Sequence, residues 1–254
     1  MPVADPSFGW QEALAAFGFV SLVAFSVTWI VTDLAHVPRT PYVAILTVTT
    51  VALSAGYLAW SGTRVADLLT DGWALGFVGG AIATAVVTPL VRRLPARPRP
   101  GGAALAGRLL WEGVVYGTAE AILLATLPVL AVWQAADALA WTDTVLGEAA
   151  SGVLAVCGAL FVILVHHLGY REFRAKASRK MLFGALAGCG IQATAFLVAG
   201  NALAPILAHI VLHWQLTLRG NSMPPSTKAE REPPRGLDVP VVPVRSRPNV
   251  GSSV

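Results

Sequence analysis

The stretch WQEALAAFGFVSLVAFSVTWIV, residues 10–31, decides the class of protein to which this chain belongs. Its one charged side chain is Glu12, and about 20 apolar residues suffice for a helix to cross the ~30 Å hydrocarbon core of a bilayer. No Lys or Arg comes before Arg39, so we expect a membrane span here and not a cleaved signal peptide. Of the 254 residues, 55% are hydrophobic and 13% are charged, whereas soluble domains carry about 25% charged residues. The sequence therefore predicts an integral membrane protein.

Six further segments have the same apolar character, which gives seven predicted spans. They are Trp10–Val31, Tyr42–Trp60, Trp73–Val91, Leu109–Trp133, Ala149–Leu168, Met181–Gly200 and Ala202–Leu218. A run rich in Pro and Arg, PARPRPGG at residues 95–102, separates the first three spans from the last four. Residues 219–254 are rich in proline and charge, so we expect a disordered tail. The predicted fold class is all-α, a polytopic transmembrane helical bundle of about seven spans.

The basic residues lie in alternate loops of this arrangement. With seven spans, all 18 Lys and Arg residues except Arg64 lie on the same side of the membrane as the tail. The positive-inside rule assigns that side to the cytoplasm. We therefore predict a multi-pass protein of the cell membrane with its N-terminus outside and its C-terminus in the cytoplasm. The net charge of +4 is explained by this orientation, and we expect no nucleic-acid partner.

Ionisable side chains inside the spans are candidates for function, because a charge at membrane depth is costly and usually faces the bundle interior. At 1.5 Å per residue from the nearest flanking Arg, Glu120 lies about 18 Å deep and His209 about 15 Å deep. On the same count His213 lies about 9 Å deep and His166 about 8 Å deep. His209 and His213 are four residues apart and therefore share a helix face. We expect these four side chains to meet in one cavity that opens to the cytoplasm, with a purely structural polar network as the alternative.

Other residues in and near the spans have structural interpretations. Glu112 is predicted to form an ion pair with Arg108, one helical turn earlier. His167 adjoins a basic loop and is interpreted as interfacial. Cys157 and Cys189 are predicted to be free thiols. Three pairs of small residues have the spacing that lets transmembrane helices approach closely: Gly76 and Gly80, Gly113 and Gly117, and Gly184 and Gly188.

Two motifs in the last spans resemble those of a known family. The stretch GNALAPILAHIVLH, residues 200–213, resembles the third and fourth motifs of the CPBP family, which comprises the CAAX-protease and bacteriocin-processing (Abi) intramembrane proteases. In that family an L-x-A-P-I-L-x-H run ends in His, here His209, and Asn or His follows four residues later, here His213. The stretch VILVH, residues 162–166, resembles the second motif, Phe-x-x-x-His, with Val in the first place.

The first motif of the family, Glu-Glu-x-x-x-Arg, is similar to YGTAEAILLA at residues 116–125. Glu120 matches its first Glu, whereas Ala121 and Ala125 stand where the family has the second Glu and the Arg. The resemblance covers roughly residues 109–218. It implies a CPBP-like protease core at residues 95–218, in the last four spans, with residues 1–94 as accessory transmembrane helices and residues 219–254 as a cytoplasmic tail.

The resemblance also implies an activity, that of a CAAX-type intramembrane endopeptidase. The implied catalytic residues are Glu120, His166, His209 and His213, with Glu120 activating a water. Glu120, His166 and His209 are implied as possible ligands of a divalent metal such as zinc. The expected partners are a membrane protein or lipidated peptide as substrate, prenylated or not, and the lipid bilayer. Two alternatives stay open: a catalytically degraded family member that acts as a membrane scaffold, and a small proton-coupled transporter.

Overall fold

The computed structural model describes residues 1–2, 4–175 and 179–221. The described residues are helical with connecting turns and contain no β-strand, which confirms the predicted all-α bundle. The first helices are α1 (Trp10–Thr28), which continues as a π-helical turn η1 (Trp29–Leu34), α2 (Arg39–Ser61), a short α3 (Val65–Leu69) and α4 (Trp73–Arg92). The last three helices are α8 (Val145–Gly169), α9 (Arg179–Ala199) and α10 (Leu203–Leu218).

Between these groups runs one long helical stretch, residues Gly102–Ala138, in which α-helical and π-helical turns alternate. Its parts are α5 (Gly102–Arg108), η2 (Leu109–Val115), α6 (Tyr116–Glu120), η3 (Ala121–Thr126) and α7 (Leu127–Ala138). Two 3₁₀ turns, η4 (Trp141–Asp143) and η5 (Arg171–Arg174), flank α8. We call the stretch from 102 to 138 the central helix.

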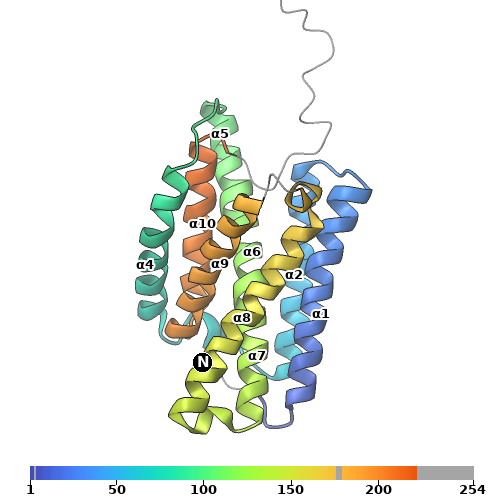
Figure 1. Ribbon diagram of the computed structural model, residues 1–254, viewed down its shortest axis with the longest axis vertical. Helices are drawn as coiled ribbons and strands as arrows, with labels where there is room; N and C mark the ends of the chain where they lie inside the picture. Colours follow the sequence, from blue (N-terminus) through green and yellow to red (C-terminus); the bar gives the residue numbers. More distant parts are fainter. Residues whose placement is uncertain (3, 176–178, 222–254) are drawn as a thin grey trace, which may run out of the picture.

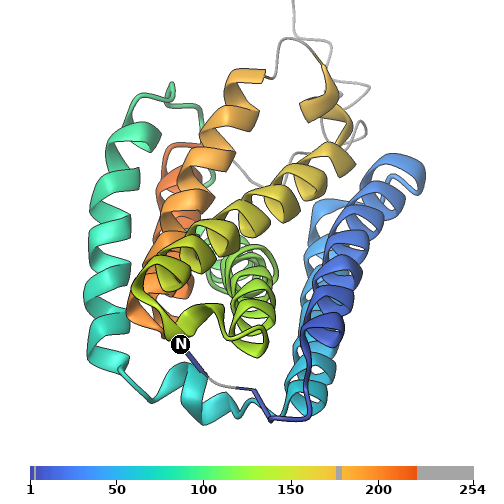
Figure 2. The same cartoon turned by 60° about the horizontal axis from the view of Figure 1, so that its bottom comes forward.

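Six helices of the described residues are long and apolar enough to cross a membrane, and each coincides with a predicted span. The seventh predicted span is α10, whose 16 residues reach only about 24 Å at 1.5 Å per residue. The central helix is distinguished by its burial, since 78% of its most apolar window is buried inside the protein, against 22–39% for the other five. Figure 2 shows its lower part surrounded by the other helices. The side chains of the central helix therefore face protein and those of the outer helices largely face lipid.

The outer helices pack on the central helix and on one another from two sides (Figure 1). Helix α1 contacts α7 and α8, and α2 contacts α6. Helix α4 lies on the other side of the molecule, where it contacts α10 and α9. Helix α8 crosses diagonally in front of the central helix. The three spans that precede residue 95 thus contact the later spans at two separate places, while the predicted boundary at residues 94 and 95 stays a prediction.

Close helix approaches explain two of the three predicted small-residue pairs. The pair at 76 and 80 on α4 and the pair at 113 and 117 on the central helix both border α10. A Cβ atom added at Gly117 would lie 3.2 Å from the Cα of Ile210, so a larger residue would push α10 away by a few tenths of an ångström. The prediction is wrong for Gly184 and Gly188, because a Cβ atom at either would have nothing within 4 Å in the described residues.

One end of the bundle bears on the predicted tail. Residues 219–221, the beginning of the predicted tail, pack on the Pro-rich loop, where the Arg97 amide donates a 2.8 Å hydrogen bond to the Arg219 carbonyl. The rest of the predicted tail, residues 222–254, lies outside the described residues.

Cys157 is exposed and Cys189 is buried, and both are free thiols as predicted.

Candidate functional site

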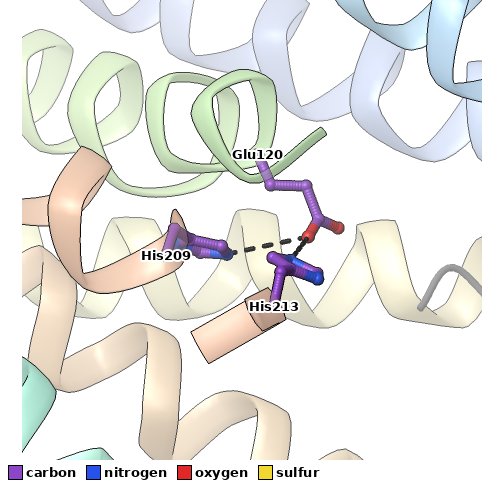
Figure 3. Close-up of side chains that lie close together, drawn as sticks. All are labelled: Glu120, His209 and His213. Atoms are coloured by element: carbon purple, nitrogen blue, oxygen red, sulfur yellow. Dashed lines mark hydrogen bonds and ion pairs between the residues drawn. The ribbon is translucent and has the colours of Figure 1, made fainter. Parts of the chain in front are cut away.

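The four ionisable side chains singled out by depth meet at one point inside the bundle. Glu120 comes from the end of α6, His166 from α8, and His209 and His213 from one face of α10. All four are 4% exposed or less. Because Gly117 has no side chain, α10 can come close enough for both of its histidines to reach the carboxylate, as Figure 3 shows. The expected meeting of the four residues is therefore what the structure contains.

The two carboxylate oxygens of Glu120 have different surroundings. Oε1 accepts a 2.6 Å hydrogen bond from the Tyr116 hydroxyl and lies 3.2 Å from Nε2 of His166. Oε2 lies 2.9 Å from Nε2 of His213 and 3.7 Å from Nε2 of His209. Oε1 is thus held by neighbours on both sides, whereas Oε2 faces the pair of imidazoles on α10. Chemistry at this carboxylate would take place at Oε2.

Oε1 belongs to a closed ring of buried hydrogen bonds, which we call the polar ring. From Tyr116 the ring passes to the Tyr170 hydroxyl at 2.9 Å and on to the Tyr42 hydroxyl at 2.8 Å. It continues to Thr28 Oγ1 at 3.3 Å and to Nδ1 of His166 at 3.0 Å. His166 closes the ring on Glu120. The members of the polar ring are Glu120, Tyr116, Tyr170, Tyr42, Thr28 and His166.

Counting hydrogens assigns the direction of each bond in the polar ring, because a hydroxyl group has one hydrogen to donate. Tyr116 donates to Glu120, so Tyr170 donates to Tyr116 and Tyr42 donates to Tyr170. Continuing the count, Thr28 donates to Tyr42, and the hydrogen between Thr28 and His166 is on Nδ1 of His166.

The neighbouring backbone supports this assignment. Nδ1 of His166 also lies 3.3 Å from the Ala24 carbonyl oxygen, which can only accept a hydrogen bond. With Nδ1 carrying a hydrogen, the contact between Nε2 of His166 and Oε1 of Glu120 requires one further proton shared by the pair. Glu120 and His166 together then carry no net charge, which lowers the cost of burying them.

Three ligand atoms at the site could hold a metal ion. The suitable atoms come from Glu120, His209 and His213, all within 4.8 Å of one another. Ligands of a tetrahedral zinc ion, each about 2.0–2.1 Å from the metal, are separated by about 3.3 Å. The separations of 2.9 and 3.7 Å at Oε2 lie on either side of that value. The residues fit a divalent metal. This group differs from the predicted ligand set, because His213 takes the place of His166, which contacts Oε1 of Glu120 instead.

One atom at the site has no partner. Nδ1 of His209 is buried and makes no hydrogen bond to any described residue. A metal-binding histidine normally donates its second ring N–H to a carboxylate, carbonyl or water. His209 therefore leaves one hydrogen-bonding position beside Glu120 that the described protein does not fill.

The two remaining predicted residues form no hydrogen bond with Glu120 in the described structure. The interfacial interpretation of His167 is wrong, because its ring is buried and lies 5.4 Å from the ring of His166. Glu112 is buried and pairs with Arg39 at 3.3 Å, with Arg108 farther away at 4.0 Å. The predicted ion pair between Glu112 and Arg108 therefore exists, but the shorter of the two Glu112 contacts is to Arg39 of α2. His167 is buried, and its Nδ1 lies 2.8 Å from the Ile163 carbonyl oxygen of the same helix.

Sequence reasoning did not identify four members of the polar ring: Thr28, Tyr42, Tyr116 and Tyr170. One of them left a signal, because Tyr116 precedes Glu120 by four residues and so lies on the same helix face. The hydroxyls of Tyr42 and Tyr170 meet across 128 residues of chain, and no local pattern indicates such a contact.

An apolar pocket in the described part of the protein lies away from the site. It has a volume of about 790 Å³ and is lined by apolar residues of α4, α8 and α9. None of the four site residues lines it. The four site residues are 4% exposed or less, so the prediction that the site opens to the cytoplasm is wrong for this conformation.

No protein-family model matches the chain, and neither does any curated protein or any solved structure.

Proposed function

We propose that this membrane protein is an intramembrane endopeptidase that hydrolyses a peptide bond of a membrane-associated or lipidated protein. The observation that carries the proposal is the buried carboxylate of Glu120 with three imidazoles directed at it. An ionisable group at membrane depth is costly and is usually kept for a function. The resemblance of residues 200–213 to the third and fourth CPBP motifs points to the same activity.

In the proposed reaction Glu120 is the general base. Its Oε2 takes a proton from a water molecule as the water oxygen attacks the carbonyl carbon of the substrate. The same proton then passes to the leaving amine nitrogen as the C–N bond breaks. A positioned acid–base group contributes typically about 10²–10⁴-fold to such a rate. Tyr116 and His166 act as positioning residues, because they hold Oε1 and so aim Oε2 at the histidines of α10.

His209 and His213 would orient the water and stabilise the negative charge that develops on the carbonyl oxygen. Together with Glu120 they are also the residues that would hold a divalent metal. A bound metal would lower the pKa of water and polarise the carbonyl. In the proposed orientation the N-terminus is outside the cell membrane and the C-terminus is in the cytoplasm.

One observation favours a second candidate function, that of a membrane scaffold without catalysis. Ala121 and Ala125, which stand at the places of the second Glu and the Arg of the first CPBP motif, are fully buried. Close packing at these two positions leaves Glu120 without the charged neighbours that the family has. In a scaffold the Glu120 cluster would serve only as a buried polar network.

The test is to look for cleavage products that depend on Glu120. Membranes from a strain that lacks the gene are incubated with the purified full chain in detergent, and new protein N-termini are identified by mass spectrometry. The endopeptidase proposal expects new N-termini inside or beside apolar segments with the wild type. Glu120→Gln keeps the size of the side chain and should reduce these products by about 10²-fold or more.

Glu112→Gln is the matched control, since Glu112 is also buried and lies eight residues earlier on the same central helix. Its amide oxygen can still accept from Arg39, so cleavage per folded molecule should persist. The ion pair to Arg39 is lost, and we expect this variant to unfold more easily. If neither glutamate affects the products, or none are found, the endopeptidase proposal fails and the scaffold replaces it.

A further inference from the structure

Gln192 is a second buried polar group that lacks partners. It lies on the buried face of α9 with Cys189, Ala193 and Phe196 and is 0% exposed. Neither its Oε1 nor its Nε2 makes a hydrogen bond to any described residue. A buried amide with both ends unpaired is unfavourable. Folding alone gives no reason for a glutamine at this position.

Gln134 on α7 is a buried glutamine whose two polar ends both have hydrogen-bond partners. It is 2% exposed, its Oε1 accepts a 2.5 Å hydrogen bond from Tyr57, and its Nε2 donates to Thr63 at 3.0 Å. Both of its polar ends are therefore satisfied inside the protein. The contrast makes the unpaired state of Gln192 a particular property of that site.

The α9–α10 hairpin brings Gln192 to the level of His209. The two antiparallel helices contact each other and are joined by a tight turn centred on Asn201. Gln192 comes nine residues before Asn201 and His209 eight residues after it, so their Cα atoms differ in depth by about 1.5 Å. Helix α9 also contacts η3, the turn that begins directly after Glu120. The unpaired amide of Gln192 and the unpaired Nδ1 of His209 thus lie at a similar depth on two helices that contact each other and η3.

We propose that Gln192 and His209 border a subsite that receives the backbone N–H and C=O of one extended substrate residue, next to Glu120. This inference rests on the proposed endopeptidase function and adds how the substrate is bound. A primary amide offers a donor and an acceptor side by side, and a residue in extended conformation offers the complementary pair, because its own N–H and C=O point to the same side. Gln192 Nε2 donates to the carbonyl oxygen of that residue, and Gln192 Oε1 accepts from its N–H. Nδ1 of His209 is the third unpaired atom at this level.

The first test separates binding from folding. Gln192→Met replaces the amide by an apolar chain of similar length in the full-length protein, and Gln134→Met is the matched control. Because the polar ends of Gln192 have no internal partner, we expect its variant to keep or raise the thermal midpoint in detergent. Gln134→Met leaves the Tyr57 hydroxyl without its partner and removes the hydrogen bond to Thr63, so it should lower the midpoint. An equal loss in both variants would show that Gln192 has a structural partner and would overturn the subsite.

The second test uses a pair of ligands that differ by one N–H. The probes are N-acetyl-leucyl-leucine methylamide and its ester analogue, in which oxygen replaces the N–H between the two leucines. Binding to the full chain is followed by tryptophan fluorescence. The wild type should prefer the amide by about tenfold, the worth of one hydrogen bond to a group otherwise left unpaired. Gln192→Met should lose that preference.

Glu120→Gln makes the two proposals distinguishable, since it should keep the preference for the amide while losing cleavage. If the wild type shows Glu120-dependent cleavage but no preference for the amide, the subsite is overturned and the endopeptidase proposal stands. An amide preference without any cleavage overturns the endopeptidase alone. The subsite is also overturned if the wild type binds both ligands equally, or binds neither up to their solubility limit. An amide preference that survives in Gln192→Met overturns it as well.

Discussion

Removing one hydroxyl from the polar ring should weaken the fold by an amount that depends on its neighbours. Tyr116→Phe deletes the 2.6 Å hydrogen bond to Glu120 and the 2.9 Å contact with Tyr170 while keeping the aromatic ring. Tyr42→Phe deletes the contacts with Tyr170 at 2.8 Å and Thr28 at 3.3 Å, and neither partner is a carboxylate. Each change removes one oxygen atom and two contacts, so the two variants form a matched pair.

The expected free energies of unfolding follow from the kinds of bond lost. Hydrogen bonds between helices in a membrane average about 0.6 kcal/mol, whereas a bond to a charged group is worth about 1.5–3 kcal/mol. Tyr116→Phe should therefore cost about 2–3.5 kcal/mol and Tyr42→Phe about 1 kcal/mol. In the double variant the Tyr170 hydroxyl loses both partners at once. A buried hydroxyl without a partner costs about 1–3 kcal/mol, so the double variant should cost at least about 1 kcal/mol more than the sum of the two single changes.

The measurement is reversible unfolding of the full chain in mixed detergent micelles, followed by circular dichroism, for the wild type, both single variants and the double variant. Tyr57→Phe is the control, because its hydroxyl bonds to Gln134 and is not part of the polar ring. Combined with Tyr116→Phe, it should add within about 0.5 kcal/mol. Equal costs for Tyr116→Phe and Tyr42→Phe, together with simple additivity in their double variant, would refute the polar ring as an energetic unit.

Three further predictions concern orientation, packing and metal binding. A reporter fused at the C-terminus should be cytoplasmic and one inserted after Asp137 external, and the reverse pattern would invert the proposed orientation. Gly117→Ala puts a methyl group 3.2 Å from the backbone of α10 and should lower the free energy of unfolding by about 1–3 kcal/mol. Gly184→Ala, whose methyl group has nothing within 4 Å, should be neutral or stabilising in the same unfolding experiment. Zinc should raise the thermal midpoint of the tag-free protein. At a zinc concentration a hundred times the dissociation constant, the free energy of unfolding should rise by about 2.7 kcal/mol. His213→Ala should abolish that shift and His36→Ala, in an exposed loop, should keep it; a shift that survives in His213→Ala would place the ion elsewhere.

The depth count found the centre of the site because an α-helix rises by a fixed amount per residue. Glu120 and His209 could be placed at similar depths from their distance to flanking arginines alone, and His213 follows on the same face of its helix. Neither depth nor the family resemblance, which implies His166 as a metal ligand, gives the direction in which a side chain points around its helix. In the structure α8 brings His166 to the other oxygen of Glu120.

The parts that were missed are neutral and depend on contacts between distant segments. Tyrosine is common near membrane interfaces, so Tyr42 at the start of its span gave no reason to expect a partner at Tyr170. Gln192 lies in an apolar run and carries no charge whose burial would call for an explanation. The π-helical turns on either side of α6 depend on packing around the central helix, and the apolar pattern of residues 102–138 resembles that of an ordinary α-helix.

The order of the partners of Glu120 along the chain has a consequence for biosynthesis. Of the described side chains that surround Glu120 in the finished structure, Tyr116 alone enters the membrane with it, because His166 and His213 follow 46 and 93 residues later. At roughly 5–20 residues per second, the ribosome needs about 5–20 s to add those 93 residues. During that time an acidic side chain waits at the insertion machinery or in the bilayer without its imidazoles, at a cost of a few kcal/mol. A newly made chain can therefore bury Glu120 stably only once its last helix has emerged, and a truncated chain exposes an unpaired acid that membrane quality control can recognise.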